Sequence, residues 1–228
     1  MSPRAEWLDA MWPRIRSRLP APPAQVIDLG CGASGGFVPM LRHAGYDALG
    51  IDPAAPDEPH YVTSTFEDAH LPRAVQAVVA STSLHHVENP AEVLDRIGAA
   101  LTSRGTLVVV EWAWEKFDRP TAEWCFDRLG ADGEENWLHR ARADWSASGE
   151  DWTTFIGDWA RREHLHRGGD LVRLLDERFD RRLLGYGPYF FADLTETTEA
   201  DEQAAIDAGL LSATRIDYVG TPRRNASP

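Results

Sequence analysis

One stretch near the start of the chain, residues 26–36 (VIDLGCGASGG), constrains the fold more than any other part of the sequence. Its first four residues are apolar or β-branched apart from Asp28, as in a strand buried within a parallel sheet. Four glycines follow within seven residues, and glycine lets the main chain turn sharply and approach a ligand closely. Apolar residues then recur at helical spacing over residues 37–44, and Gly45 ends the pattern. The stretch therefore predicts a strand, a glycine loop and a helix.

The glycine loop indicates a cofactor site, and two classes of cofactor use such a loop. Gly30, Gly32 and Gly35 have the spacing found in nicotinamide and flavin dinucleotide sites. Asp28 argues against a dinucleotide, because its carboxylate, two residues before the first glycine, would repel a pyrophosphate and attract a cation. S-adenosylmethionine carries an ammonium group and a sulfonium and no phosphate, so the loop favours it.

At residues 28–32, Asp-Leu-Gly-Cys-Gly, the sequence resembles the first motif of the class I S-adenosylmethionine-dependent methyltransferases. The resemblance covers residues 24–111 closely and 171–220 in outline. It implies an α/β fold with a seven-stranded, Rossmann-like, doubly wound sheet. It also implies S-adenosylmethionine as cofactor and S-adenosylhomocysteine as product.

A second acidic position follows the strand predicted over residues 46–51. Asp52-Pro53 lies 22 residues after Gly30, close to the spacing of about 20 at which an acid reaches the ribose hydroxyls. A carboxylate there accepts charge-assisted hydrogen bonds and would repel the 2′-phosphate of NADP.

After the weak third strand, residues 60–64, the resemblance implies an acid that accepts from the adenine amino group and an apolar residue that packs on the ring. Phe66 fits the apolar role, and either Glu67 or Asp68 fits the acidic one.

The fourth strand, residues 74–81, ends in a loop that holds the candidate general bases. Ligands of open α/β sheets bind outside the carboxyl ends of the strands, and the turn Leu84-His85-His86 resembles the small-molecule branch of the family. A helix over 90–101 and a fifth strand over 106–110 follow, ending at Glu111. We expect the base to be His86 or His85, then Glu111, with Tyr186 a remote candidate. The sequence shows no acid cluster after the fourth and fifth strands, so we predict no metal.

Residues 112–168 break the sheet pattern and contain seven of the nine tryptophans. The segment is too long for an ordinary loop and too aromatic for a disordered one. Its helical stretches break at Gly130, Gly133 and Gly149. We interpret it as a helical cap, inserted after the fifth strand, that covers an apolar or aromatic guest.

The C-terminal part resumes the α/β pattern, with a helix over 171–179, a strand over 181–190, a helix over 199–208 and an antiparallel edge strand over 213–220. At the other end, residues 5–19 form an amphipathic helix that either packs on the sheet or covers the cofactor, with Arg14 or Arg18 meeting its carboxylate. The sequence thus divides into an N-terminal helix (1–20), an S-adenosylmethionine-binding core (21–111), the cap (112–168), the completion of the core (169–220) and a tail (221–228).

Composition excludes several classes of protein. The formal net charge of −13 argues against a nucleic-acid surface, which is normally basic. Cys31 and Cys125 indicate free thiols in a reducing compartment. No apolar leader or run of about 20 apolar residues is visible. We expect a cytoplasmic monomer or homodimer.

The sequence therefore predicts methyl transfer from S-adenosylmethionine to a small apolar or aromatic acceptor by in-line displacement. The alternatives are a non-catalytic S-adenosylmethionine-binding protein that regulates or stabilises a partner and, less favoured, an NAD-dependent oxidoreductase. The expected cofactor contacts are Asp28, Gly30, Cys31, Gly32, Gly35, Asp52, Pro53, Phe66, Glu67, Asp68 and Ser81.

Overall fold

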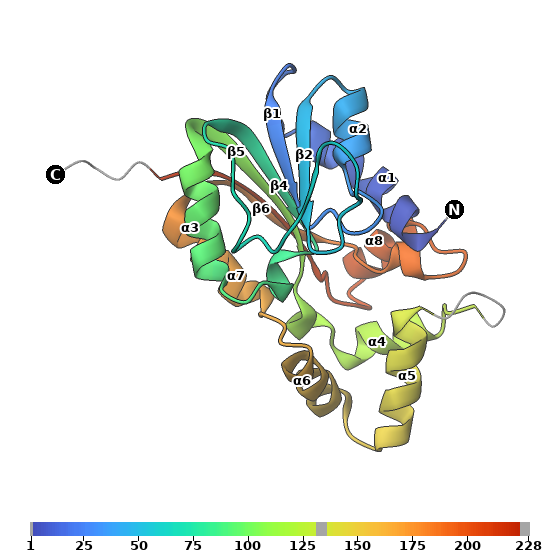
Figure 1. The fold of residues 1–228 in the computed structure, drawn as a ribbon. Coiled ribbons are helices and arrows are strands. Elements are labelled where there is room, and N and C mark those ends of the chain that lie inside the picture. The colour runs from blue at the N-terminus through green and yellow to red at the C-terminus, as the bar shows by residue number, and fades with distance from the viewer. Residues whose placement is uncertain (1, 131–135, 224–228) are drawn as a thin grey trace.

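The computed structural model describes residues 2–130 and 136–223 and contains one seven-stranded sheet with helices on both faces (Figure 1). The strands are β1 (Gln25–Leu29), β2 (Asp47–Asp52), β3 (Tyr61–Thr63), β4 (Val75–Ser81), β5 (Leu101–Trp112), β6 (Phe179–Gly187) and β7 (Arg215–Pro222). The α-helices are α1 (Pro3–Arg16), α2 (Val38–His43), α3 (Pro90–Ala100), α4 (Arg119–Phe126), α5 (Trp137–Ser148), α6 (Trp152–Arg162), α7 (Gly168–Arg178) and α8 (Glu199–Asp207). This architecture confirms the α/β, doubly wound fold class.

The strand order is β3-β2-β1-β4-β5-β7-β6, and β7 runs antiparallel to both of its neighbours. The chain leaves β1 toward β2 and β3 and then returns to begin β4 on the other side, which makes the β1–β4 boundary the switch point of the sheet. Ligands of open α/β sheets bind at this point, outside the carboxyl ends of the strands. The residues that follow β1, β2 and β4 are therefore the expected lining of a ligand site.

Two expectations about the C-terminal strands are wrong. The last strand is not the edge of the sheet: β7 lies between β5 and β6, and β6 forms the edge. The burial patterns explain the order, because β7 is mostly buried and the middle of β6 is mostly exposed. The tail also begins later, since Thr221 and Pro222 still pair with Asp180 and Phe179; residues 224–228 lie outside the described residues.

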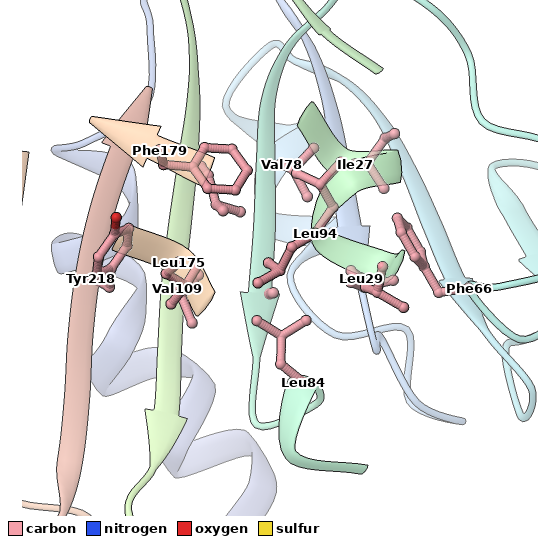
Figure 2. Packing of buried hydrophobic residues seen from close by; sticks show 14 of the residues in the cluster. Ile27, Leu29, Phe66, Val78, Leu84, Leu94, Val109, Leu175, Phe179 and Tyr218 are labelled. Carbon is pink, nitrogen blue, oxygen red and sulfur yellow. The ribbon is translucent and has the colours of Figure 1, made fainter. Parts of the chain in front are cut away.

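Each face of the sheet carries its own apolar core. On one face α3 and α7 bury leucines and isoleucines against the strands, as Figure 2 shows for Leu94 and Leu175 beside Val78 and Val109. On the other face α1 and α2 pack Met11 and other apolar residues against the strands. Because both faces are covered, the central strands are apolar throughout, and polar groups are left to the strand ends.

Residues 112–168 contain helices α4, α5 and α6, which lie together beyond one end of the sheet (Figure 1). They share a third apolar cluster that includes Trp112, Phe117 and Trp152. Gly149 ends α5 in the left-handed conformation, with φ of 68°, whereas Gly133 lies outside the described residues. We keep the name cap for residues 112–168.

Helix α1 packs on the sheet, and the two candidate arginines, Arg14 in the helix and Arg18 just after it, lie away from the residues that follow β1, β2 and β4. Arg14 pairs with Glu199, with Nη2 and Oε1 2.6 Å apart. Arg18 lines a groove between α1 and strands β5, β6 and β7. Among the described residues, no helix has the length and apolar character needed to cross a membrane.

Candidate functional site

Left-handed glycines shape the loop between β1 and α2. Gly30 has φ of 80° and donates its N–H to the carbonyl of Ile51, at 2.9 Å. A side chain at Gly30 would overlap Ser83, so the loop needs glycine there to pack against the segment after β4. Gly32 also has a positive φ, of 65°, but a Cβ there would meet nothing within 4 Å. Gly32 therefore leaves open main chain on the outer side of the loop.

Asp28 lies beneath this loop. Its side chain is buried, and Oδ2 accepts a hydrogen bond from the Phe37 N–H at 2.6 Å. Burial raises the pKa of Asp28 to about 7, opposed by the Phe37 N–H and by the charge of Arg4. The carboxylate thus fixes the junction between loop and helix.

The carboxyl ends of β1, β2 and β4 enclose a cavity of about 440 Å³, here called the strand-end cavity. Its lining includes seven of the residues expected from the sequence: Gly30, Asp52, Pro53, Phe66, Glu67, Asp68 and His86. It also includes residues that the sequence analysis did not single out: Ser64, Thr65, Thr82, Ser83, Val87 and Glu88. Asp28, Cys31, Gly32, Gly35 and Ser81 were expected at the site but do not line the cavity.

Four acids line the strand-end cavity, and three of them already accept a hydrogen bond from a neighbouring group. Asp52 uses Oδ1 to accept from the Ala54 N–H at 2.8 Å, which leaves Oδ2 available to a ligand. Glu67 accepts from the Glu88 N–H at 3.0 Å, and the Asp68 carboxylate accepts from the Thr65 hydroxyl at 2.9 Å. Phe66, buried beside them, supplies an apolar surface. The cavity thus suits a ligand that offers several donors and one flat apolar group.

A buried histidine–glutamate pair lies behind the loop after β4. His85 Nδ1 is 2.5 Å from Glu111 Oε2, while Oε1 of the same carboxylate accepts from the N–H groups of Ser83 and Leu84. Burial alone would raise the pKa of Glu111, but His85 and these N–H groups hold it below its ordinary value. An ionised carboxylate only accepts, so Nδ1 of His85 carries the proton and Nε2 has a free lone pair when the ring is neutral.

His86 stands beside this pair, with its ring 4.1 Å from that of His85, centroid to centroid. Its side chain lines the strand-end cavity and is more exposed than that of His85. Partial burial and the neighbouring His85 lower the pKa of His86 below its usual value, with Glu111 opposing them. The structure thus brings His85, His86 and Glu111 together. Tyr186 lies apart on the edge strand β6, 42% exposed.

A second cavity of about 360 Å³, here called the aromatic cavity, adjoins the first at Thr82. It is lined by Ser2, Pro3, Arg4, Trp7, Thr82, Asn136, Tyr189, Ala192 and Asp193. Tyr189 stacks on Trp112 with ring centroids 5.5 Å apart, and Trp112 in turn meets the edge of His85 at 6.5 Å. The aromatic cavity therefore lies one ring away from the histidine pair.

Polar groups in the aromatic cavity come from distant parts of the chain. Asp193 Oδ2 accepts from Trp137 Nε1 at 3.0 Å, and burial raises the pKa of this carboxyl despite that bond. Burial also raises the pKa of Tyr189, with Glu111 and Asp193 adding to the effect. Glu202 holds this wall in place, because its buried carboxylate accepts from the N–H groups of residues 189, 190 and 191.

The described residues contain no group of three or more histidine, cysteine, aspartate or glutamate side chains arranged to hold a metal ion. The expectation that the reaction needs no metal stays a prediction.

Comparison with known proteins adds a family match. The model of a family described as "Methyltransferase domain" matches residues 4–177. No curated protein matches the chain.

Solved structures share the fold at low sequence identity. An S-adenosylmethionine-dependent methyltransferase from Mesorhizobium loti is 21% identical, with 95% of this chain and 100% of that chain covered and a TM-score of 0.56. A putative methyltransferase from an antibiotic biosynthesis pathway of Anabaena variabilis is 15% identical, with coverage of 93% and 97% and a TM-score of 0.57. A geranyl diphosphate C-methyltransferase from Streptomyces coelicolor, in complex with Mg²⁺, geranyl diphosphate and S-adenosyl-L-homocysteine, is 14% identical, with coverage of 94% and 79% and a TM-score of 0.59.

Proposed function

This chain belongs to the class I S-adenosylmethionine-dependent methyltransferases, and on that premise we propose that it methylates a small aromatic or apolar metabolite by in-line displacement. The observation that carries the proposal is the adjacency of an acid-lined cavity and an aromatic cavity, which share Thr82. The first suits a cofactor and the second suits an acceptor. The His85–Glu111 pair lines neither cavity; it lies behind His86, which lines the first, and behind Trp112, which stacks on Tyr189 of the second.

The lining of the strand-end cavity fits S-adenosylmethionine better than a dinucleotide. Its described lining contains four acids, Asp52, Glu67, Asp68 and Glu88, and neither arginine nor lysine. A pyrophosphate would meet repulsion there, whereas ribose hydroxyls and an adenine amino group are donors that carboxylates accept. This supports the S-adenosylmethionine assignment over the NAD-dependent alternative, which the family match does not favour.

Asp52 accepts from the ribose hydroxyls through its free Oδ2 in this proposal. Phe66 packs against the adenine ring, and Glu67 or Asp68 accepts from the adenine amino group. S-adenosylmethionine, when bound, supplies a methyl group on a positively charged sulfur. The sulfur is a good leaving group because it becomes a neutral thioether when the methyl group is transferred. The protein's main contribution is then to align donor and acceptor, which can lower a barrier by about 7–11 kcal/mol.

The base in this proposal is His85, with Glu111 as its positioning residue. Glu111 holds the proton of His85 on Nδ1, so that Nε2 can take a proton from an acceptor hydroxyl or amine. A general base of this kind contributes a factor of about 10²–10⁴ when the acceptor must lose a proton. His86 lines the cavity itself and is the second candidate.

The acceptor class follows from the walls of the aromatic cavity. Trp7 and Tyr189 meet edge to face with ring centroids 5.1 Å apart and present apolar surface, while Asp193 adds a hydrogen-bonding end. A flat ring that carries a hydroxyl or amine satisfies both features. We include in the proposal that residues 112–168 act as a cap on this acceptor side.

Two assays in sequence test the proposal. Calorimetric titration with S-adenosylmethionine, S-adenosylhomocysteine and NAD should show binding of the first two and not of NAD. A panel of phenols, quinones and aromatic amines should then release S-adenosylhomocysteine in the presence of protein. Binding of NAD alone would contradict the cofactor site, and cofactor binding with no turnover across the panel would favour the non-catalytic alternative.

A further inference from the structure

The two adjoining cavities hold very little positive charge. Four acids line the strand-end cavity, and Asp193 lines the aromatic cavity. Among the residues that the structure describes in the two linings, Arg4 is the one arginine or lysine. A ligand that brings a carboxylate into this acidic surrounding needs a cation beside it. S-adenosylmethionine carries such a carboxylate at its amino-acid end.

Arg4 is anchored at the junction of the cavities. Its Nη1 donates to Thr82 Oγ1 at 3.2 Å, and Thr82 is the residue that lines both cavities. Thr82 is itself fixed, because its N–H donates to the Val110 carbonyl at 2.8 Å. One turn further along α1, the buried Trp7 stacks on Phe191 with ring centroids 5.7 Å apart. Thr82 therefore holds the guanidinium at this place, while Trp7 anchors the helix that carries it.

The bond to Thr82 uses one of the five N–H donors of an arginine. Within residues 2–130 and 136–223, Arg4 takes part in none of the ion pairs, whereas Arg14 on the same helix pairs with Glu199. Burial raises the pKa of both Asp28 and Cys31, and Arg4 is close enough to the glycine loop for its charge to oppose that rise. Its remaining donors are thus available near the loop.

The order of the strands indicates where the carboxylate end of a bound cofactor would lie. The groups assigned to ribose and adenine follow β2 and β3, and β1 separates these strands from β4, which ends at Thr82. A cofactor held by those groups would have its amino-acid end on the other side of β1, toward the end of β4. We propose that Arg4 binds the carboxylate of S-adenosylmethionine from its position on Thr82, an inference that rests on the proposed function.

A ligand pair that differs only in this group tests the inference. We would measure by calorimetry the Kd of S-adenosylmethionine and of decarboxylated S-adenosylmethionine for the full chain, Arg4→Gln, Arg4→Lys and the control Arg14→Gln. Loss of a charge-assisted pair predicts that Arg4→Gln binds S-adenosylmethionine about 10- to 100-fold more weakly. The decarboxylated ligand should bind Arg4→Gln and the unchanged chain equally, Arg4→Lys should lie between, and Arg14→Gln should match the unchanged chain.

Several outcomes would overturn the assignment. Equal losses for both ligands in Arg4→Gln would give Arg4 a structural role only. If Arg4→Gln binds both ligands as tightly as the unchanged chain but has a higher KM for a carboxylate-bearing acceptor, Arg4 binds the carboxylate of the acceptor instead. If the unchanged chain binds neither ligand, the proposed function itself fails. If the unchanged chain binds S-adenosylmethionine and its decarboxylated form with the same Kd, the inference is contradicted. This measurement does not depend on whether Arg4→Gln folds.

Discussion

The strand-end cavity and the aromatic cavity meet at Thr82, yet they are assembled in opposite ways. The first is lined by residues 29–88, almost all at the ends of parallel strands or in the segments that follow them. The second combines the first turn of α1, the N-cap of α5 and residues 189–193. One site is built by the topology of a sheet, and the other by side-chain packing between distant segments. We therefore expect substitutions to separate the two functions cleanly.

The largest separation should come from Asp52→Ala. Removing a carboxylate that accepts two ribose hydroxyls should weaken S-adenosylhomocysteine binding at least 100-fold, since each charge-assisted bond contributes about 1.5–3 kcal/mol. Calorimetry measures the loss, with Asp57→Ala, an exposed acid five residues later, as the matched control. If Asp52→Ala binds the ligand as tightly as the control does, the ribose assignment is wrong.

The converse experiment uses Trp152→Ala in the cap. Trp152 is 1% exposed, packs on Phe117 at 5.0 Å between ring centroids, and donates Nε1–H to the Phe117 carbonyl. Its loss should cost about 3–5 kcal/mol of unfolding free energy while changing the Kd of S-adenosylhomocysteine less than about threefold. Trp145 is half-exposed, so the control Trp145→Ala should lower the unfolding free energy by less. If the Kd of S-adenosylhomocysteine rises together with the loss of stability, the cap and the strand-end cavity do not act separately.

The same contrast explains what could be predicted from the sequence. The glycine loop, Asp52 and the histidine turn are local patterns at strand ends, and the order of strands in a doubly wound sheet then brings them together. The error about β7 arose because alternation along one strand says nothing about which strands flank it. The fold class was therefore predictable, and the order of the last two strands was not.

Side-chain direction was the second limit. Asp28, Cys31 and Ser81 lie at the expected places along the chain, but all three are buried and do not line the strand-end cavity, so their part in cofactor binding stays a prediction. Arg4 and Tyr189 reach the aromatic cavity only through tertiary packing, so no local motif marks them. Glu202 lies in the helix predicted over 199–208, and only its three backbone N–H partners reveal its buried role.

A third prediction concerns the boundary between the cavities. His85→Asn keeps a donor that can reach Glu111 and removes the distal nitrogen, so the fold should persist while kcat falls by about 100-fold for an acceptor that must lose a proton. Single-turnover kinetics at saturating S-adenosylmethionine measures this step. In the control His86→Asn, kcat should fall by a smaller factor. A larger loss in His86→Asn than in His85→Asn would reverse the assignment of the base.

The smallest effect is a pH dependence of stability at His86. Its pKa is lowered from 6.5 in an ordinary histidine to about 4 in the folded chain, by partial burial and by His85. The unfolded chain therefore binds a proton more readily, so this contribution to stability is complete above pH 6.5 and is lost as the pH falls toward 4. Because the ring is still exposed, we expect no more than about 1 kcal/mol.

Comparison with His86→Gln isolates this effect. Burial raises the pKa of Asp28 to about 7, which gives the opposite slope in part of the same range, so the total stability curve cannot assign either group. The difference in unfolding free energy between the unchanged chain and His86→Gln should shift toward the variant as the pH falls from 6.5 to 4. His43→Gln, at an exposed histidine of α2, should show no such shift. A flat difference for His86→Gln would show that partial burial and His85 do not lower the pKa of His86 in the folded chain.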